Sequence, residues 1–478
     1  MKRLLPSFAV LALALTACEQ GGESVDREAN DESEKQELNA QASAKGLSTE
    51  KVERLYSQAT EFYQKGKFPQ AKAVMTQAYA AFEQLPNKDE ANRVNFLREL
   101  CKTSFQLRED KKAMEYANQI LTHAKTDEDK AFAHSQLGSI RRRQGEHEQA
   151  LEHHEKALEL RLEDLGEAHP EVGGIYHDVG ITWFEQGEYD RAISYHEQAL
   201  SIWLNALDPK DPRIASAYHG TGIAYGKKGA HGKAIANYRE ALAIWEQSLD
   251  SKHPDLATAY NNLGVAQDGM AQHEEAIASH KKALSIRLSI LGPTDPDVAA
   301  SYSNLGSAYV GANEFDQALV QHKKALAICL QSLGSDHPSV AAIYNNIGGI
   351  HSQNGEPGKA LDHYRKCLAI ELKSLGPEHP DVATTYNNLG AMHIGKKEYA
   401  EAVDCYLKCL AIEQKSLGPE HLDVAITHQL IGSIHAAKGD KESAIASLLQ
   451  AKTIRMKKLG PQHPLTKSAL EDIRKLSP

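Results

Sequence analysis

One stretch of the sequence decides the fold: YNNLGVAQDGMAQHEEAIASHKKALSIRLSILGPTDPDVA, residues 260–299. Its pattern returns at intervals of 42 residues, most visibly as one glycine per interval: Gly138, Gly180, Gly222, Gly264, Gly306, Gly348, Gly390 and Gly432. Twelve residues after each glycine stands an alanine, and seven residues further on stands an alanine or a cysteine. Self-similarity at a fixed period is typical of repeat architectures, so the 478 residues indicate one repeat array rather than several unrelated domains.

Each interval is predicted to form two helices. Residues 300–309 represent the first, helix A, and residues 314–333 the second, helix B, with Ala318, His322, Ala325 and Ile328 at helical spacing. Five of the turns between them carry a glycine where a helix ends in a left-handed residue: Gly145, Gly187, Gly229, Gly355 and Gly439. Asn313 is the next-best residue for that position, and Ala271 and Lys397 fit it less well.

These columns of small and aromatic residues resemble the tetratricopeptide repeat, in the 42-residue form found in kinesin light chains. The resemblance covers most of the chain and implies an all-α, right-handed superhelical solenoid of about ten helix pairs with a C-terminal capping helix. The expected divisions are two divergent repeats over 48–126, eight regular repeats over 127–464 and the capping helix over 465–478. No heptad coiled coil precedes the repeats, which excludes a motor-linked role.

The N-terminal residues are typical of an export signal that ends at a lipidation site. Lys2 and Arg3 precede an apolar run that is too short to span a bilayer as a helix and that ends in Leu-Thr-Ala-Cys at Cys18. The run resembles a bacterial lipoprotein signal, which implies removal of residues 1–17 and acylation of Cys18. An ordinary cleaved signal peptide is the alternative. In the lipoproteins that the run resembles, an aspartate after the cysteine retains the protein in the inner membrane. Glu19 stands at that position, so the resemblance implies the outer membrane and a location facing the periplasm. Residues 18–47 are acidic and nearly free of large apolar side chains, which predicts a disordered tether.

Composition and motifs exclude several function classes. Lys and Arg number 54 against 64 Asp and Glu, a net charge of −10, so no nucleic-acid partner is expected. The 23 histidines fall mostly in two repeat columns, one before helix A as helix caps and one inside helix B as packing residues, so no metal site is expected. No nucleotide-binding or catalytic motif is present, and we expect no cofactor, no small-molecule substrate and no enzyme activity.

The cysteines within the repeats occupy columns of small residues. Cys101 and Cys367 are therefore predicted to be reduced and buried. The same is expected of Cys405 and Cys409, although the sequence leaves open the redox state of these two.

The predicted helices A carry a run of asparagines near the glycine column: Asn261, Asn262, Asn304, Asn345, Asn346, Asn387 and Asn388. In the family that the repeats resemble, this surface is concave and holds extended peptides. The asparagines two residues before each glycine match the peptide-contacting position of that family: Asn262, Asn304, Asn346 and Asn388. An amide both donates and accepts, so it can pair with a peptide backbone. The competing interpretation is that the amides link neighbouring helices.

Arg141, Arg142 and Arg143 form a possible site for an acidic ligand, although a solvated surface is the ordinary explanation for them. Together these features predict a membrane-tethered module that binds a protein or peptide on its concave face. The alternatives are a scaffold for envelope assembly that acts through its convex face or ends and, less favoured, an enzyme with an unrecognised site.

Overall fold

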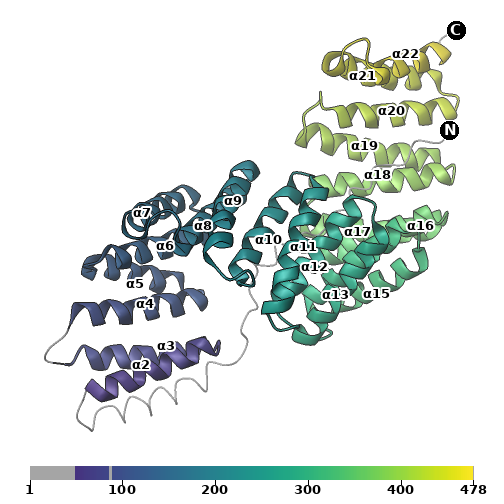
Figure 1. Ribbon diagram of the computed structural model, residues 1–478. Coiled ribbons are helices and arrows are strands. Elements are labelled where there is room, and N and C mark those ends of the chain that lie inside the picture. Colours follow the sequence, from purple (N-terminus) through teal and green to yellow (C-terminus); the bar gives the residue numbers. More distant parts are fainter. Residues whose placement is uncertain (1–48, 86–88, 477–478) are drawn as a thin grey trace. The chain divides into compact units, whose positions relative to one another are not determined.

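The computed structural model describes residues 49–85 and 89–476, and every regular element within them is a helix (Figure 1). The predicted N-terminal signal peptide and lipidation site, Cys18 included, lie outside the described residues. The all-α prediction is confirmed for the described part of the chain. No described helix combines the length and the apolar character that crossing a bilayer requires.

The chain divides into two compact units, one ending at Ser251 and the other continuing from Lys252. The helices of the first are α2 (Thr49–Gln64), α3 (Phe68–Phe82), α4 (Glu90–Gln106), α5 (Asp110–His123), α6 (Asp127–Arg143), α7 (His147–Leu165), α8 (Pro170–Glu185), α9 (Tyr189–Ala206), α10 (Pro212–Lys227) and α11 (His231–Ser248). The helices of the second are α12 (Pro254–Gly269), α13 (His273–Leu291), α14 (Pro296–Gly311), α15 (Phe315–Ser332), α16 (Pro338–Gln353), α17 (Pro357–Ser374), α18 (Pro380–Gly395), α19 (Tyr399–Ser416), α20 (Leu422–Ala437), α21 (Lys441–Leu459) and α22 (Pro464–Leu476). Even-numbered helices up to α20 are helices A, and the odd-numbered helices that follow them are helices B.

Each helix A packs along the helix B that follows it, and the glycine column explains how the two come so close. Gly306 of α14 faces the ring of His322 on α15, and a Cβ on this glycine would lie 2.7 Å from the ring Nε2. The buried ring therefore occupies the space that a side chain would need. The same seat recurs in eight pairs: Gly138–His154, Gly180–His196, Gly222–Tyr238, Gly264–His280, Gly306–His322, Gly348–Tyr364, Gly390–Tyr406 and Gly432–Leu448. The predicted packing role of the helix B histidines is confirmed.

The turns from helix A to helix B take the left-handed conformation that the sequence predicts. Gly145 has φ 77°, and Asn313 and Lys397 both have φ 61°. Ala271 has φ 57°, a conformation that disfavours a residue with a Cβ by about 1 kcal/mol. In that turn the N–H of Gln272 donates to the carbonyl of Gln267 at 2.9 Å, which closes helix α12.

The loop histidines cap the helices A. At α16, the N–H of Ser339 donates to Nδ1 of His337 at 3.1 Å. Asp295 makes the equivalent bond to the N–H of Asp297 at 2.8 Å. The caps confirmed in this way are His169, Asp211, His253, Asp295, His337, His379 and His421, and His463 makes the same bond before α22.

Replacing His337 by alanine is expected to lower the free energy of unfolding by about 1 kcal/mol, because the N–H of Ser339 loses its acceptor. His337→Asp is the matched control and should keep wild-type stability, since the chain itself uses Asp211 and Asp295 at this position. Urea unfolding followed by circular dichroism measures both. Full stability in the alanine variant would show that the bond contributes nothing.

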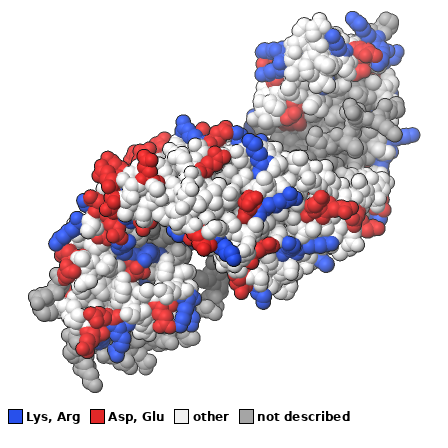
Figure 2. All heavy atoms as spheres, in the orientation of Figure 1, with Lys and Arg blue, Asp and Glu red and all other residues white. Residues whose placement is uncertain are grey.

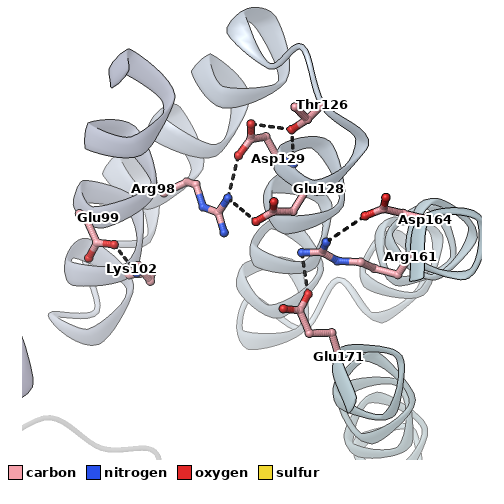
Figure 3. A network of polar contacts seen from close by, with 9 residues as sticks. All are labelled: Arg98, Glu99, Lys102, Thr126, Glu128, Asp129, Arg161, Asp164 and Glu171. Atoms are coloured by element: carbon pink, nitrogen blue, oxygen red, sulfur yellow. Dashed lines mark hydrogen bonds and ion pairs between the residues drawn. The ribbon is translucent and has the colours of Figure 1, made fainter. Parts of the chain in front are cut away.

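A second recurrent position joins each helix B to the next helix A. Arg161 of α7 is nearly buried and pairs with Glu171 of α8 at 2.7 Å (Figure 3). Across the repeats this position holds Arg161, Trp203, Trp245, Arg287, Cys329, Glu371, Glu413 and Arg455. Further back in the chain, Arg98 of α4 bridges to Glu128 and Asp129 of α6 at 2.9 and 2.7 Å (Figure 3). The residue that joins successive repeats at this position therefore varies between charged, aromatic and thiol side chains.

Candidate functional site

The asparagine columns lie on four successive helices A of the second unit, α12, α14, α16 and α18. All seven side chains are half-buried. Successive helices A contact each other directly, as α12 does α14 and α14 does α16. The asparagines therefore lie where one repeat meets the next along the helix A surface.

Two amide–amide hydrogen bonds cross between these helices. Nδ2 of Asn304 donates to Oδ1 of Asn261 at 2.9 Å, joining α14 to α12. Nδ2 of Asn388 donates to Oδ1 of Asn345 at 3.0 Å, joining α18 to α16. Four of the seven predicted binding residues thus link helices, as the competing interpretation expects.

The remaining amides show where this bracing stops. The position on α14 that would pair with Asn346 holds Ser303, and its hydroxyl lies 3.5 Å from the ring of His322 instead. The position on α20 that would pair with Asn387 holds Leu430, which has no amide. Asn346 and Asn387 flank the Asn388–Asn345 bond, and the side-chain amide of neither makes a hydrogen bond to another described residue. Asn262 has a polar partner of its own.

The three consecutive arginines do not form a common binding surface. Each is engaged by a different carboxylate: Arg141 by Glu146, Arg142 by Glu185 and Arg143 by Asp110. Arg143 also donates to the carbonyl of Phe105 and stacks over its ring at 3.9 Å. An acidic ligand would have to displace these ion pairs, and the function proposed below does not use this patch.

The cysteines of the repeats are buried and unbridged: Cys101, Cys329, Cys367, Cys405 and Cys409. Burial raises the pKa of the Cys101 thiol to about 12 and that of Cys329 to about 11, so both stay protonated at neutral pH. A protonated, buried thiol is a poor nucleophile, which gives these side chains a packing role. Among the described residues, no group of three or more His, Cys, Asp or Glu side chains is arranged to hold a metal ion.

Sequence reasoning missed two buried carboxyl groups at the junction position. Oγ1 of Thr427 on α20 donates to Oε2 of Glu413 on α19 at 2.8 Å, and Cys409 donates to Oε1. Burial raises the pKa of Glu413 and, one repeat earlier, that of Glu371. Their return after 42 residues was the available signal, but the two glutamates stand alone in a column that otherwise holds Arg, Trp and Cys.

Comparison with known proteins agrees with this architecture. A tetratricopeptide repeat model matches seven overlapping segments, residues 129–205, 174–247, 213–289, 270–331, 297–373, 339–412 and 381–457. No curated protein sequence matches the chain.

Solved structures with the same kind of fold include the apo form of the quorum sensor NprR from B. thuringiensis. It shares 14% identity, with a TM-score of 0.55, over 76% of this chain and 99% of its own. A Rap protein complexed with Competence and Sporulation Factor shares 16% identity, with a TM-score of 0.47, over 77% and 99% of the two chains. BtubC (BKLC) from P. vanneervenii shares 24% identity, with a TM-score of 0.41, over 49% and 91%.

Proposed function

This chain belongs to the tetratricopeptide repeat family, and from that premise we propose that it captures an extended segment of a partner protein along the asparagines of α12, α14, α16 and α18. The array of helix pairs is a protein–protein interaction module. Folds of this kind are typically non-enzymatic interaction scaffolds.

The observation that carries the proposal is the pair of unbonded amides at Asn346 and Asn387. Each is half-buried, so it is held in place by its helix, and each has both a donor and an acceptor to offer. An extended backbone presents alternating C=O and N–H groups, which such amides can bind with little regard for the side chains. Each bond contributes about 1 kcal/mol net, which is enough for modest affinity when several act together.

The bonded asparagines have a supporting role in this proposal. Asn388–Asn345 and Asn304–Asn261 hold successive helices A in register. Rigid placement of Asn346 and Asn387 lowers the ordering entropy that a ligand must overcome. The two interpretations of the asparagine run therefore apply to different residues.

A photocrosslinking amino acid at Asn387 tests the proposal in cells. We expect it to capture a partner protein, because a bound segment would lie within reach of the amide. The same crosslinker at Ala278, exposed on helix B α13, is the matched control and should not capture that partner. Equal capture from both positions would contradict binding along the helices A.

We further propose that the module is tethered by lipid at Cys18 to the outer membrane and faces the periplasm. The support is the apolar run that ends in Leu-Thr-Ala-Cys, with Glu19 next to it. Stable anchoring needs two acyl chains or one chain and a second signal, and a triacylated cysteine meets that need.

Cells fed a clickable fatty acid should incorporate it into the wild-type chain and not into Cys18→Ser, because only the thiol accepts the diacylglycerol. Gel fluorescence after the click reaction measures the incorporation. Cys101→Ser is the matched control and should label fully, since its thiol is buried. Labelling that survives in Cys18→Ser would contradict the anchor.

A further inference from the structure

Two stripes of opposite charge lie on helices B, whereas the asparagine columns lie on helices A, and no described residue forms an ion pair with either stripe. The acidic stripe runs along α7 and consists of Glu148, Glu152, Glu155, Glu159 and Glu163. The basic stripe crosses three successive repeats on α13, α15 and α17 and consists of Lys281, Lys323, Lys324, Arg365 and Lys366. All ten side chains are exposed.

The acidic stripe occupies one face of its helix, because its members recur every three or four residues. Red side chains gather over α7 in Figure 2. None of the five carboxylates forms an ion pair with a described residue, although Lys156 lies on the same helix. Like charges spaced four residues apart destabilise a helix slightly, so the isolated chain gains nothing from this arrangement.

The basic stripe is held in position without being neutralised. Nζ of Lys324 lies 5.2 Å from the ring centre of Tyr302, and Nζ of Lys366 lies 5.5 Å from that of Tyr344. Lys281 sits 5.5 Å from the ring of Tyr309 in the same way. An aromatic face restrains an ammonium group but adds no opposite charge. In the described part of the chain, no carboxylate forms an ion pair with any of the five. By contrast, Lys408, the equivalent of Lys366 one repeat later, is paired with Asp404.

We propose that the basic stripe of one molecule binds the acidic stripe on α7 of a second copy of this chain. The charges are complementary and equal in number, and no described residue forms an ion pair with either stripe. From Glu148 to Glu163 the acidic stripe measures about 22 Å at ~1.5 Å per residue. The basic stripe is also extended, because it crosses the helices B of three successive repeats.

The contact is heterologous, because each molecule uses two different surfaces. After one pairing, the first copy still has its acidic stripe free and the second copy its basic stripe, so the association continues from molecule to molecule unless a ring closes. Val320, one turn before Lys324 on α15, is also exposed and adds an apolar contact beside the charges. The helix A asparagines stay open, so this association is independent of the proposed peptide capture.

Zero-length carbodiimide crosslinking tests the pairing directly, since it joins lysine amines to carboxylates in contact. Full-length chains with light and heavy nitrogen isotopes are mixed in mild detergent and crosslinked at about 50 mM and about 500 mM salt. We expect mixed-isotope crosslinks between the α7 peptide and the peptides that hold Lys281, Lys323, Lys324 or Lys366, at least fivefold weaker in high salt. Absence of these crosslinks, or their occurrence only within one isotope, would overturn the proposal.

Charge-reversal variants separate this pairing from general attraction. The acidic-stripe variant is Glu152→Lys/Glu155→Lys/Glu159→Lys. The basic-stripe variant is Lys281→Glu/Lys323→Glu/Arg365→Glu. Each should lose the mixed-isotope crosslinks at least fivefold, and the combined sixfold variant, which has wild-type net charge, should regain them.

The matched control, Lys438→Glu/Lys441→Glu/Lys458→Glu, changes the net charge as the basic-stripe variant does but lies on exposed sites elsewhere. It should crosslink like the wild type, with circular dichroism confirming the fold of every variant. If the control loses the crosslinks equally, or the combined variant does not recover, the stripes do not pair. If the basic-stripe lysines instead crosslink to another protein, the second-copy proposal is wrong. It is also wrong if these lysines become protected from chemical modification only when anionic vesicles are present.

Discussion

A chain carrying Gly306→Ala is expected to unfold at clearly lower urea concentration than the wild type, with a loss of about 2 kcal/mol. The new Cβ would lie 2.7 Å from Nε2 and 2.8 Å from Cδ2 of the His322 ring. That ring is 1% exposed, so it lies in the packed interior between the two helices. Overpacking of this kind costs about 1–3 kcal/mol, against a gain in helix propensity of at most ~1 kcal/mol.

The chain supplies a matched control for this substitution in Gly395, which is also helical. A Cβ there meets no atom within 4 Å. Gly395→Ala should therefore raise stability slightly through helix propensity alone, by about 0.5 kcal/mol at most because Gly395 is the last residue of α18. His322→Ala in the Gly306→Ala background should be less harmful than in the wild type, because it removes the clash. Equal effects of the two glycine substitutions on stability would contradict the close packing of the His322 ring against Gly306.

The second large effect is a loss of stability as the pH falls from about 6.5 towards 4. Burial lowers the pKa of His154 and of His196 to about 3, and both side chains are almost fully buried. Between these values and the ordinary histidine pKa of about 6.5, the unfolded chain binds protons that the folded chain does not. Stability therefore rises with pH across this window, by up to about 1.4 kcal/mol per pH unit for each histidine.

Neighbouring groups on α8 and α10 modify this dependence. Burial lowers the pKa of His177 and of His219 to about 4, which adds to the slope. Burial raises the pKa of Asp178 to about 6, and because this carboxyl is protonated more readily in the folded chain, it opposes the slope. Among these neighbours, one opposing carboxyl does not cancel four histidines; elsewhere in the chain, the raised pKa of Glu371 and of Glu413 also opposes the slope, at its acidic end.

The test replaces His154 and His196 together by tyrosine, the residue that fills the same seat at Tyr238, Tyr364 and Tyr406. At pH 7.5 the variant should match the wild type closely. At pH 4.5 it should be more stable than the wild type by about 2–5 kcal/mol, because the two titrations are absent. Urea unfolding at both pH values measures the difference, and parallel pH profiles for the two proteins would contradict the assignment.

Much of the fold follows from the sequence because it depends on contacts within one repeat. The glycine column, the buried rings and the helix caps depend on residues close together in the sequence. Their roles can therefore be predicted from residue types that recur at a fixed spacing. Ala271 and Lys397 take the left-handed turn because the adjoining helices fix it, even though their own preference opposes it.

The candidate site was harder to predict because it depends on how one repeat meets the next. Asn304 pairs with Asn261, 43 residues away, one more than the repeat length. That offset is set by the packing of successive helices A and is invisible in aligned columns. For the same reason, the carboxylate partners of Arg142 and Arg143, 43 and 33 residues distant, could not be identified from the run of arginines alone.

The most direct test of peptide capture is the affinity of the partner identified by crosslinking, measured by calorimetry for two matched variants. Asn346→Ala/Asn387→Ala removes the two unbonded amides of helices A. Asn205→Ala/Asn237→Ala removes two exposed amides of helices B that bond only to their own helices. We predict that the first variant binds at least tenfold more weakly than the wild type and that the second binds equally well. Unchanged affinity in the first variant, with its fold intact, would contradict capture along the helices A.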